Sequence, residues 1–213
     1  MGDYFVTRII VAHSDLLDLS LPKSNFLIMS RKPSAIESPR NQILKGANIL
    51  AIALKDDGKI PNSKLPLLLY QAATALPQND PAHVFEELFE DNGWSDSWRN
   101  GIYSYHHYHS TAHEVLGIYR GSAKVQLGGE DGVVEEVQAG DVIVIPAGVA
   151  HRNLGSSHDF GVVGAYPEGQ DWDMNYGKSE ERPRADQNIA RVGLPRLDPV
   201  FGENGPLIEK WSA

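Results

Sequence analysis

Five of the eight histidines of this chain gather at two places, and they are its clearest sign of chemistry. Four of them lie between residues 106 and 113, and the fifth, His151, follows a Pro-Ala-Gly turn. Neutral imidazoles beside a carboxylate such as Glu114 suit Fe(II), Mn(II), Ni(II) or Zn(II) without selecting among them. The chain contains no cysteine, which excludes thiolate sites and disulfides. We therefore expect the histidines to bind one divalent metal ion.

The spacing of the histidines indicates which of them can share an ion. In an extended strand alternate side chains lie on one face, so His107 and His109 can both point inward while His106 points away. Metal–nitrogen bonds of about 2.1 Å would let the two inward rings converge on one cation. His151 supplies a third imidazole if a second strand lies against the first, which the turn before it would permit.

Strand parity leaves the fourth ligand open. Counting by twos from His107 reaches His113 and not Glu114. Either a bulge near Ser110-Thr111 shifts the phase and brings Glu114 to the ion, or His113 is itself the ligand. If Glu114 is the ligand, His113 lies behind it or at the rim of the site.

Three polar side chains are candidates for the wall of a substrate pocket. Tyr103 and Tyr105 share strand parity with the paired histidines, and Asn153 shares it with His151. Their polar groups would orient a ligand, although packing in an aromatic core explains the two tyrosines equally well. The sequence does not identify a catalytic residue, and Tyr105 and His113 are the candidates for handling a proton.

Short β-like runs broken by glycine turns surround these residues. They occur at residues 102–109, 114–120, 123–127, 133–137, 142–145 and 159–166. An earlier apolar run, 49–54, precedes a helix that the apolar spacing predicts over about 81–92. Trp94 and Trp98 follow, one turn apart if their segment is helical. The pattern indicates a mainly β barrel or sandwich with one preceding helix.

The character of the chain changes at about residue 46. Residues 1–46 show no stable hydrophobic period, so we expect an N-terminal extension that is poorly ordered. Residues 47–213 should form a single β-barrel domain with a flanking helix and a loop-rich C-terminal segment. Trp172, Leu207 and Trp211 in that segment suggest that it folds back over the barrel.

The composition argues against nucleic acid and membranes as binding partners. With a net charge of −9, a pI of about 5.3 and no run of Lys and Arg, the surface disfavours nucleic acid and anionic membranes. The first thirty residues lack the pattern of a secretory signal, and no apolar stretch is long enough for a membrane span. We therefore expect a cytoplasmic protein whose partner is a small molecule.

Two motifs around the histidines closely resemble those of the cupin superfamily. The first motif, with its glycines, paired histidines and glutamate, is met by Gly101, His107, His109, Glu114 and Gly121. The second is met by Gly140, Pro146, Gly148 and His151. The asparagine that the family has four residues after the last histidine is Gly155 here, with Asn153 two places earlier, so the end of the second motif is altered.

The resemblance implies a cupin-type, double-stranded jelly-roll β-barrel in which His107, His109, Glu114 and His151 bind one cation. Further stretches are similar to a small, single-domain, YjlB-like type of cupin that has no established reaction. They are residues 85–89, 93–94, 98–101 and 164–167. Because related barrels pair through edge strands, the resemblance is also compatible with a homodimer.

The leading functional hypothesis is a small-molecule metalloenzyme, an iron- or manganese-dependent oxygenase in which open coordination positions receive substrate and dioxygen. Two alternatives remain. One is a non-catalytic module that binds a small anion or sugar acid through the metal, and the other is an oxygen-independent isomerase or hydrolase. Metal identity and oxygen uptake discriminate among the three.

Overall fold

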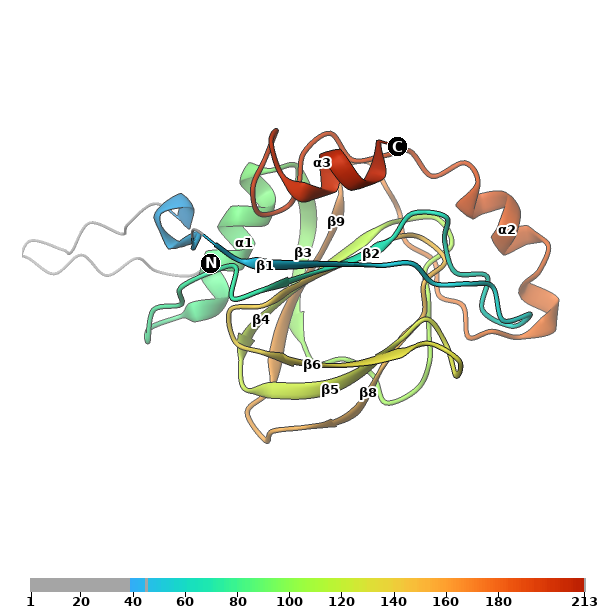
Figure 1. Ribbon diagram of the computed structural model, residues 1–213, viewed down its shortest axis with the longest axis horizontal. Helices are drawn as coiled ribbons and strands as arrows, with labels where there is room; N and C mark the ends of the chain where they lie inside the picture. Colours follow the sequence, from blue (N-terminus) through green and yellow to red (C-terminus); the bar gives the residue numbers. More distant parts are fainter. Residues whose placement is uncertain (1–38, 45, 213) are drawn as a thin grey trace, which may run out of the picture. The chain divides into compact units, whose positions relative to one another are not determined.

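The computed structural model describes residues 39–44 and 46–212, in which two antiparallel β-sheets face each other (Figure 1). The strands are β1 (Asn48–Ile52), β2 (Leu67–Gln71), β3 (Trp94–Asn100), β4 (Glu114–Arg120), β5 (Ser122–Leu127), β6 (Val133–Gln138), β7 (Val142–Ile145), β8 (His151–Ser156) and β9 (Gly161–Pro167). The helices are the 3-10 helices η1 (Pro39–Gln42) and η2 (Ser179–Glu181) and the α-helices α1 (Pro81–Asp91), α2 (Arg184–Ile189) and α3 (Pro206–Trp211).

The two sheets differ in size. The larger has six strands in the order β1-β2-β7-β4-β9-β3, and the smaller has three in the order β6-β5-β8. All of these pairings are antiparallel. In Figure 1 the smaller sheet lies below the larger one, and α1 and α3 lie above the larger sheet. The expected mainly β fold is thereby confirmed.

Strand β2 of the larger sheet is buried on both of its faces. Leu67 and Leu69 belong to the core between the sheets, together with apolar residues of β4 and β5. Leu68 and Tyr70 belong to a second core, together with Phe85 of α1 and residues of α3. Because successive side chains alternate and both faces are covered, β2 is an unbroken apolar run without the usual alternation.

Several predicted elements have nearly the expected bounds. The strands predicted at 114–120 and 142–145 are β4 and β7, and the helix predicted at about 81–92 is α1. The segment of Trp94 and Trp98 is not helical, so the two residues are not one helical turn apart; both lie in β3. This strand pairs irregularly with β9, and the register shifts between Ser95 and Trp98, where Asp96 has a positive φ of 55°.

The strand predicted at 102–109 is also wrong. This segment is irregular apart from two single-residue bridges, from His107 to His151 and from Tyr108 to Asn175. It connects β3 of the larger sheet to β4, and on the way its backbone bonds to β8 of the smaller sheet at Tyr103 and His107 and to a later loop at Tyr108. A continuous ladder therefore does not form there.

Part of the expected N-terminal extension is among the described residues. Residues 39–42 form η1, and Ile43 makes an antiparallel bridge to Thr74 and packs against the core beneath α1. The Leu44 amide donates to the Ala73 carbonyl oxygen at 2.8 Å. Residues 1–38 lie outside the described residues, so the expected lack of order in them stays a prediction.

The C-terminal segment returns to the larger sheet. Leu207 and Trp211 of α3 are buried, and the Trp211 indole Nε1 donates to the Pro66 carbonyl oxygen at 2.9 Å. The buried Asp198 carboxylate accepts hydrogen bonds from the Tyr70 hydroxyl and from three backbone amides of the same segment. Trp172, in contrast, is half exposed.

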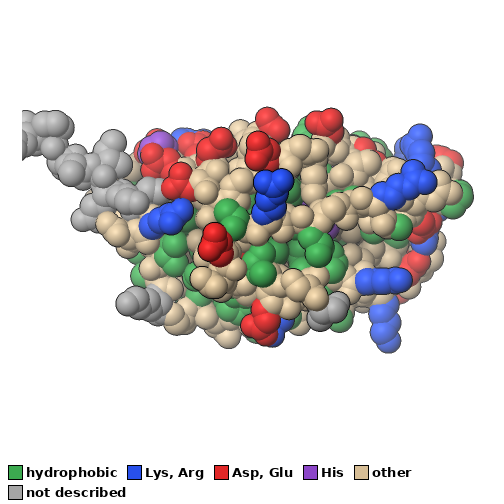
Figure 2. All heavy atoms as spheres, turned by 90° about the horizontal axis from the view of Figure 1, so that it is seen from above, with side chains coloured by type: hydrophobic (Ala, Val, Ile, Leu, Met, Phe, Trp, Pro, Cys, Tyr) green, Lys and Arg blue, Asp and Glu red, His purple; other side chains and the backbone are tan. Residues whose placement is uncertain are grey.

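The surface is mixed in charge. On the face in Figure 2, acidic and basic side chains are interspersed among apolar ones, and Lys and Arg form no continuous basic surface there. Within the described residues, no helix combines the length and the apolar character that crossing a bilayer requires.

Candidate metal centre

Three imidazoles and one carboxylate meet in the interior of the domain. His107, His109, Glu114 and His151 have exposed fractions of only 2–5 %. Polar groups that are buried this deeply need partners, because an uncompensated charge or donor costs free energy away from water. The contacts among the four side chains therefore decide what the cluster can do.

Backbone pairing brings the distant histidines together. His107 and His151 form an antiparallel bridge with N···O distances of 3.3 and 3.0 Å, and their ring centroids are 4.1 Å apart. The turn before His151 requires Gly148, whose φ is +94° and whose added Cβ would lie 2.4 Å from the Asn62 carbonyl oxygen. The Gly148 amide donates to the His109 carbonyl oxygen at 2.8 Å, so the same turn also anchors His109.

The carboxylate of the cluster comes from the first residue of β4. The chain bends at residues 110–111, which breaks the strand alternation, so Glu114 and not His113 faces the rings. Glu114 Oε2 lies 3.6 Å from His109 Nε2 and 3.4 Å from His151 Nε2. The interruption expected near residues 110–111 is thus a bend in irregular chain rather than a bulge within a strand.

The electrostatics of the cluster keep two rings neutral and the carboxyl ionised. Burial lowers the pKa of His107, and burial together with His107 lowers the pKa of His151 to about 3. Burial alone would raise the pKa of Glu114, but the facing His109, followed by His151, outweighs it and lowers that pKa. Neutral imidazoles and an ionised carboxylate are the forms that bind a metal.

The loop after β9 holds His109 and the residue that follows it. His109 Nδ1 donates a hydrogen bond to the Asp173 carbonyl oxygen, so Nε2 is the ring nitrogen that faces the cluster. The Asp173 carboxylate accepts from the Ser110 amide and the Ser110 hydroxyl, each at 2.6 Å. These contacts fix both the ring tautomer and the ring direction.

A second set of contacts holds the carboxylate. The Tyr166 hydroxyl donates to Glu114 Oε1 at 3.2 Å, and the Trp98 indole Nε1 donates to the Tyr166 oxygen at 3.3 Å. Oε1 is therefore engaged, while Oε2 faces the imidazoles. Burial and the Glu114 charge raise the pKa of Tyr166, so its hydroxyl stays protonated and remains a donor.

The donor set fits a divalent cation. Glu114 Oε2 is buried without a hydrogen-bond partner in the described residues. Among residues 39–44 and 46–212, no group of three or more His, Cys, Asp or Glu side chains is arranged, as it stands, to hold a metal ion. A cation would have to draw the four side chains closer together.

A cavity of about 300 Å³ opens onto the cluster. Four of its lining residues are the four side chains of the cluster, and the rest of the wall is largely apolar. Its aromatic and aliphatic residues are Trp98, Ile102, Tyr103, Leu116, Tyr166, Trp172 and Met174. The volume is at the lower end of the range for small-molecule sites.

Tyr103 lines this cavity, as the pocket prediction requires, but Tyr105 and Asn153 lie elsewhere. Tyr105 stacks on Tyr103 with ring centroids 5.0 Å apart and lines a second cavity. The Asn153 side chain bonds to Ser156 Oγ and to the Gly155 amide in its own strand. The parity argument fails for Tyr105 because residues 102–106 are not a strand.

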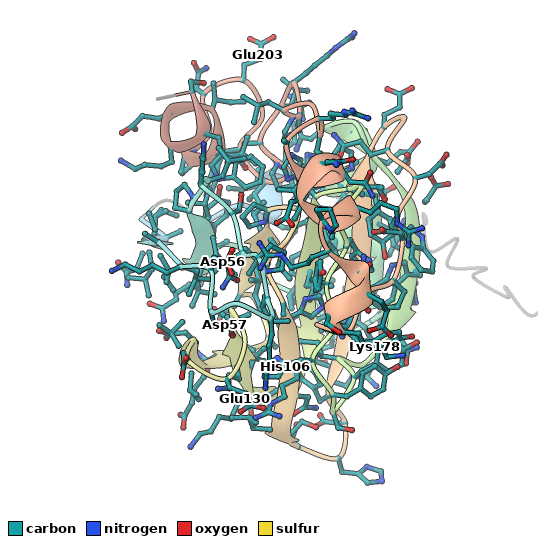
Figure 3. All side chains as sticks on the ribbon, turned by 90° about the vertical axis from the view of Figure 1, so that its right-hand side faces the viewer. Asp56, Asp57, His106, Glu130, Lys178 and Glu203 are labelled. Carbon is teal, nitrogen blue, oxygen red and sulfur yellow. The ribbon has the colours of Figure 1, made fainter. Side chains whose placement is uncertain are left out.

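The remaining candidate histidines face other surroundings. The His113 ring packs against Trp211 with ring centroids 4.7 Å apart, and its Nδ1 accepts a hydrogen bond from the Ala147 amide at 3.0 Å. His106 lines the second cavity, of about 760 Å³, where its Nε2 lies 3.8 Å from Glu130 Oε1 (Figure 3). Neither His113 nor Tyr105, the two candidates for proton handling, lines the cavity at the cluster.

Sequence reasoning missed Tyr166 and Asp173. Strand pairing would have found the tyrosine, because β9 lies beside β4 with Ala165 opposite Val115, which puts the next residue of β9 near Glu114. Nothing in the sequence marks Asp173, whose role depends on a contact across 63 residues to Ser110.

The comparisons agree with the two motifs. A family model described as "Cupin domain" matches residues 99–159. A relative from Bacillus subtilis (strain 168), called "Uncharacterized protein YjlB", is 46% identical over 157 residues, which are 73% of this chain and 92% of the relative. The segment that the family model matches contains all four residues of the cluster.

Solved structures give partial likenesses. Acireductone dioxygenase from Bacillus anthracis with a cadmium ion in its active centre is 17% identical, with a TM-score of 0.37, over 62% of this chain and 83% of that one. Pumpkin seed globulin is 23% identical, with a TM-score of 0.32, over 46% of this chain, which spans only 28% of the globulin. At these TM-scores the likenesses say nothing about activity.

Proposed function

This chain belongs to the cupin superfamily, in its YjlB-like group, and from that premise we propose that its buried histidine cluster is a metal centre acting on a small molecule. His107, His109 and His151 would each offer a neutral ring nitrogen to one divalent ion, and Glu114 would offer one carboxylate oxygen. The observation that carries the proposal is the buried Glu114 Oε2, which lacks a hydrogen-bond donor and lies 3.4 and 3.6 Å from two imidazole nitrogens.

The charge of the cluster is compatible with a bound cation. Three neutral rings and one carboxylate carry a net charge of −1, and burial makes an uncompensated charge costly. Without a metal, the pKa of His109 is raised by Glu114 against the opposing effect of burial, and a proton on that ring brings the net charge to zero. A divalent ion would replace that proton and would take the ring nitrogen and the carboxylate oxygen as ligands.

We propose an oxygenase-type reaction as the activity. An iron or manganese ion held by these four ligands would leave open positions for a substrate and dioxygen and would polarise both. The protein would supply the rest. Tyr166 holds Glu114 through Oε1, the Asp173 carbonyl orients His109, and the apolar wall of the cavity excludes water from the reactants.

Elemental analysis tests the metal centre. Protein purified without a metal-binding tag should contain about one equivalent of a transition metal, and His107→Ala and His151→Ala should each lose most of it. His83→Ala and His158→Ala are matched controls, because the partly buried His83 and the exposed His158 lie outside the cluster and their variants should keep the metal. Unchanged metal in both cluster variants would refute the proposal.

Oxygen uptake tests the reaction class. Iron- or manganese-loaded protein should consume dioxygen with a suitable substrate, and the two cluster variants should not. Tightly held zinc without turnover would instead support the non-catalytic binding module, and turnover without oxygen uptake would support an isomerase or hydrolase.

A further inference from the structure

We infer that the molecule that binds beside the metal is small, uncharged away from its metal-binding end and largely apolar. This inference rests on the proposed function, because it concerns the cavity onto which the histidine cluster opens. It deepens that function by naming a substrate class, and it disfavours the sugar acids and other polyanions that a metal-binding module could also take.

The volume of the cavity limits the size of the ligand. At roughly 30 Å³ for each water molecule, about 300 Å³ corresponds to about ten waters. A ligand of on the order of ten non-hydrogen atoms would fill it. Such a molecule is a single ring with a few substituents or a short branched chain.

The charges in the wall disfavour a distal acidic group. Among the described residues that line the cavity, Arg99 provides the one permanent cation, and its hydrogen bonds to two carboxylates engage most of its N–H donors. Its Nε and Nη2 donate to Glu86 at 2.6 Å each, and its Nη1 donates to Asp80 at 2.8 Å. Arg99 lowers the pKa of both carboxyl groups, so they stay ionised and the three side chains together carry a net charge of −1.

A carboxylate or phosphate on the far end of a ligand would therefore meet a cation whose charge two carboxylates already offset. Arg99 is exposed, so this end of the cavity is open to water, and the anion would face the net negative charge of the Arg99 group there. It would gain no ion pair, whereas apolar substituents gain free energy by contact with the wall.

The aromatic side chains form a flat wall that suits a planar or apolar group. The rings of Tyr166 and Trp172 are stacked at 5.9 Å with an interplanar angle of 20°, and Trp172 also meets His109 edge-on at 5.5 Å. Trp172 is 51 % exposed although it lines the cavity. A ligand that covers this large apolar surface would bury it, so Trp172 is placed to contribute to affinity.

Two catechols that differ only in a distal group test the inference. 4-Methylcatechol and 3,4-dihydroxybenzoate present the same pair of oxygens to a metal. At the far end the first carries a methyl group and the second a carboxylate. Binding to zinc-loaded full-length protein is measured by calorimetry and by quenching of tryptophan fluorescence, without dioxygen and without turnover. Each affinity for the protein is divided by the affinity of the same catechol for free zinc, which corrects for the intrinsic strength of the zinc–catechol bond.

We expect 4-methylcatechol to bind at least tenfold more tightly than 3,4-dihydroxybenzoate on this corrected scale. Trp172→Ala should weaken its binding by about tenfold, while Trp172→Phe, which keeps an aromatic ring, should weaken it less. Met174→Lys, which adds a cation to the wall, should reduce or reverse the preference. Zinc content is measured in every sample to show that the centre is intact.

The outcomes separate the two proposals. Protein that holds no zinc overturns the metal centre and this inference with it. Protein that holds zinc but prefers the carboxylate, binds both catechols equally or binds neither overturns the inference on substrate class and leaves the metal centre standing.

Discussion

The Glu114 carboxylate has two different surroundings, one for each oxygen. Oε1 accepts the Tyr166 hydroxyl at 3.2 Å, whereas Oε2 has no donor and faces two imidazoles. A neutral donor on one oxygen restricts rotation of the group and directs the other oxygen at the proposed ion. Groups that orient metal ligands in this way affect affinity nearly as much as the ligands do.

Removing the tyrosine hydroxyl should therefore weaken metal binding. We expect Tyr166→Phe to reduce zinc or iron affinity by roughly tenfold, at the lower end of the range for such partners, because the carboxylate loses its orienting donor. Competition against a chromophoric chelator measures the change. Tyr103→Phe is the matched control, since this tyrosine lines the same cavity without contacting Glu114, and an equal loss in both variants would contradict the assignment.

His113 and Glu114 are neighbours in the sequence with different expected roles. Substituting Glu114 by Gln should strip the metal with little loss of stability, because the shape of the side chain is kept. His113→Leu should keep the metal but lower the free energy of unfolding by about 1–3 kcal/mol, since the buried Ala147 amide loses its acceptor. Metal analysis and urea denaturation of both variants check the pair of outcomes, and metal loss in His113→Leu would make that ring the ligand.

At the scale of elements, α1 fixes the strand that carries the carboxylate. Phe85 of α1 lies over Gly117 of β4, and a Cβ added at this glycine would be 2.5 Å from two atoms of the phenyl ring. The ring is fully buried, so it has no open space to move into. The close approach of helix and strand therefore requires glycine at this position.

An alanine at this contact should destabilise the domain. We expect Gly117→Ala to lower the free energy of unfolding by about 1–3 kcal/mol through overpacking. Gly155→Ala is the control in another strand, because nothing lies within 4 Å of its added Cβ, and it should change stability by less than about 0.5 kcal/mol. Thermal and urea denaturation compare the two, and similar stability in both variants would contradict the packing argument.

At the scale of the whole molecule, distant segments are joined by charge as well as by the core. Arg182 donates two hydrogen bonds to Asp56, at 2.8 and 2.7 Å, and two to Asp186 of α2, at 2.9 and 2.6 Å. Residues 126 positions apart are thereby linked, and Figure 3 labels Asp56 on its loop. Such bidentate pairs are stronger than ordinary surface ion pairs, although solvent still screens them.

This link should make part of the stability depend on pH. Hydrogen bonds from Arg182, followed by one from the Gly58 amide, hold the pKa of Asp56 below its usual 3.8. A depressed folded pKa stabilises the protein above pH 3.8, and the contribution is lost as the pH falls through the folded pKa. Arg182→Gln should lower Tm by roughly 1–4 °C at pH 7, with the difference shrinking below pH 3.8.

Melting curves from pH 7 to pH 2.5 check this dependence. The exposed Arg184 provides a matched control, and Arg184→Gln should change Tm little at any pH. A difference between wild type and Arg182→Gln that stays constant down to pH 2.5 would show that the ion pair does not account for it.

Much of the fold and the ligand set could be predicted from the sequence because both depend on local patterns. The apolar runs of β4 and β7 and the amphipathic α1 are encoded within a few residues. The motif spacing pointed to His107, His109, Glu114 and His151 before any geometry was known. Tyr105 and Asn153 were misplaced because their assignment depended on a regular strand through residues 102–109 that the chain does not form.

By itself, the sequence determined the residue types of a metal centre, the mainly β architecture and the family. Only the tertiary structure decided that a bend and not a bulge turns Glu114 toward the rings, that Tyr166 and Asp173 hold the ligands and that the cavity has no unpaired cation in its described wall. The physical reason is that these features arise from contacts between segments far apart in the chain, set by strand pairing and by a bend, and no local pattern encodes them.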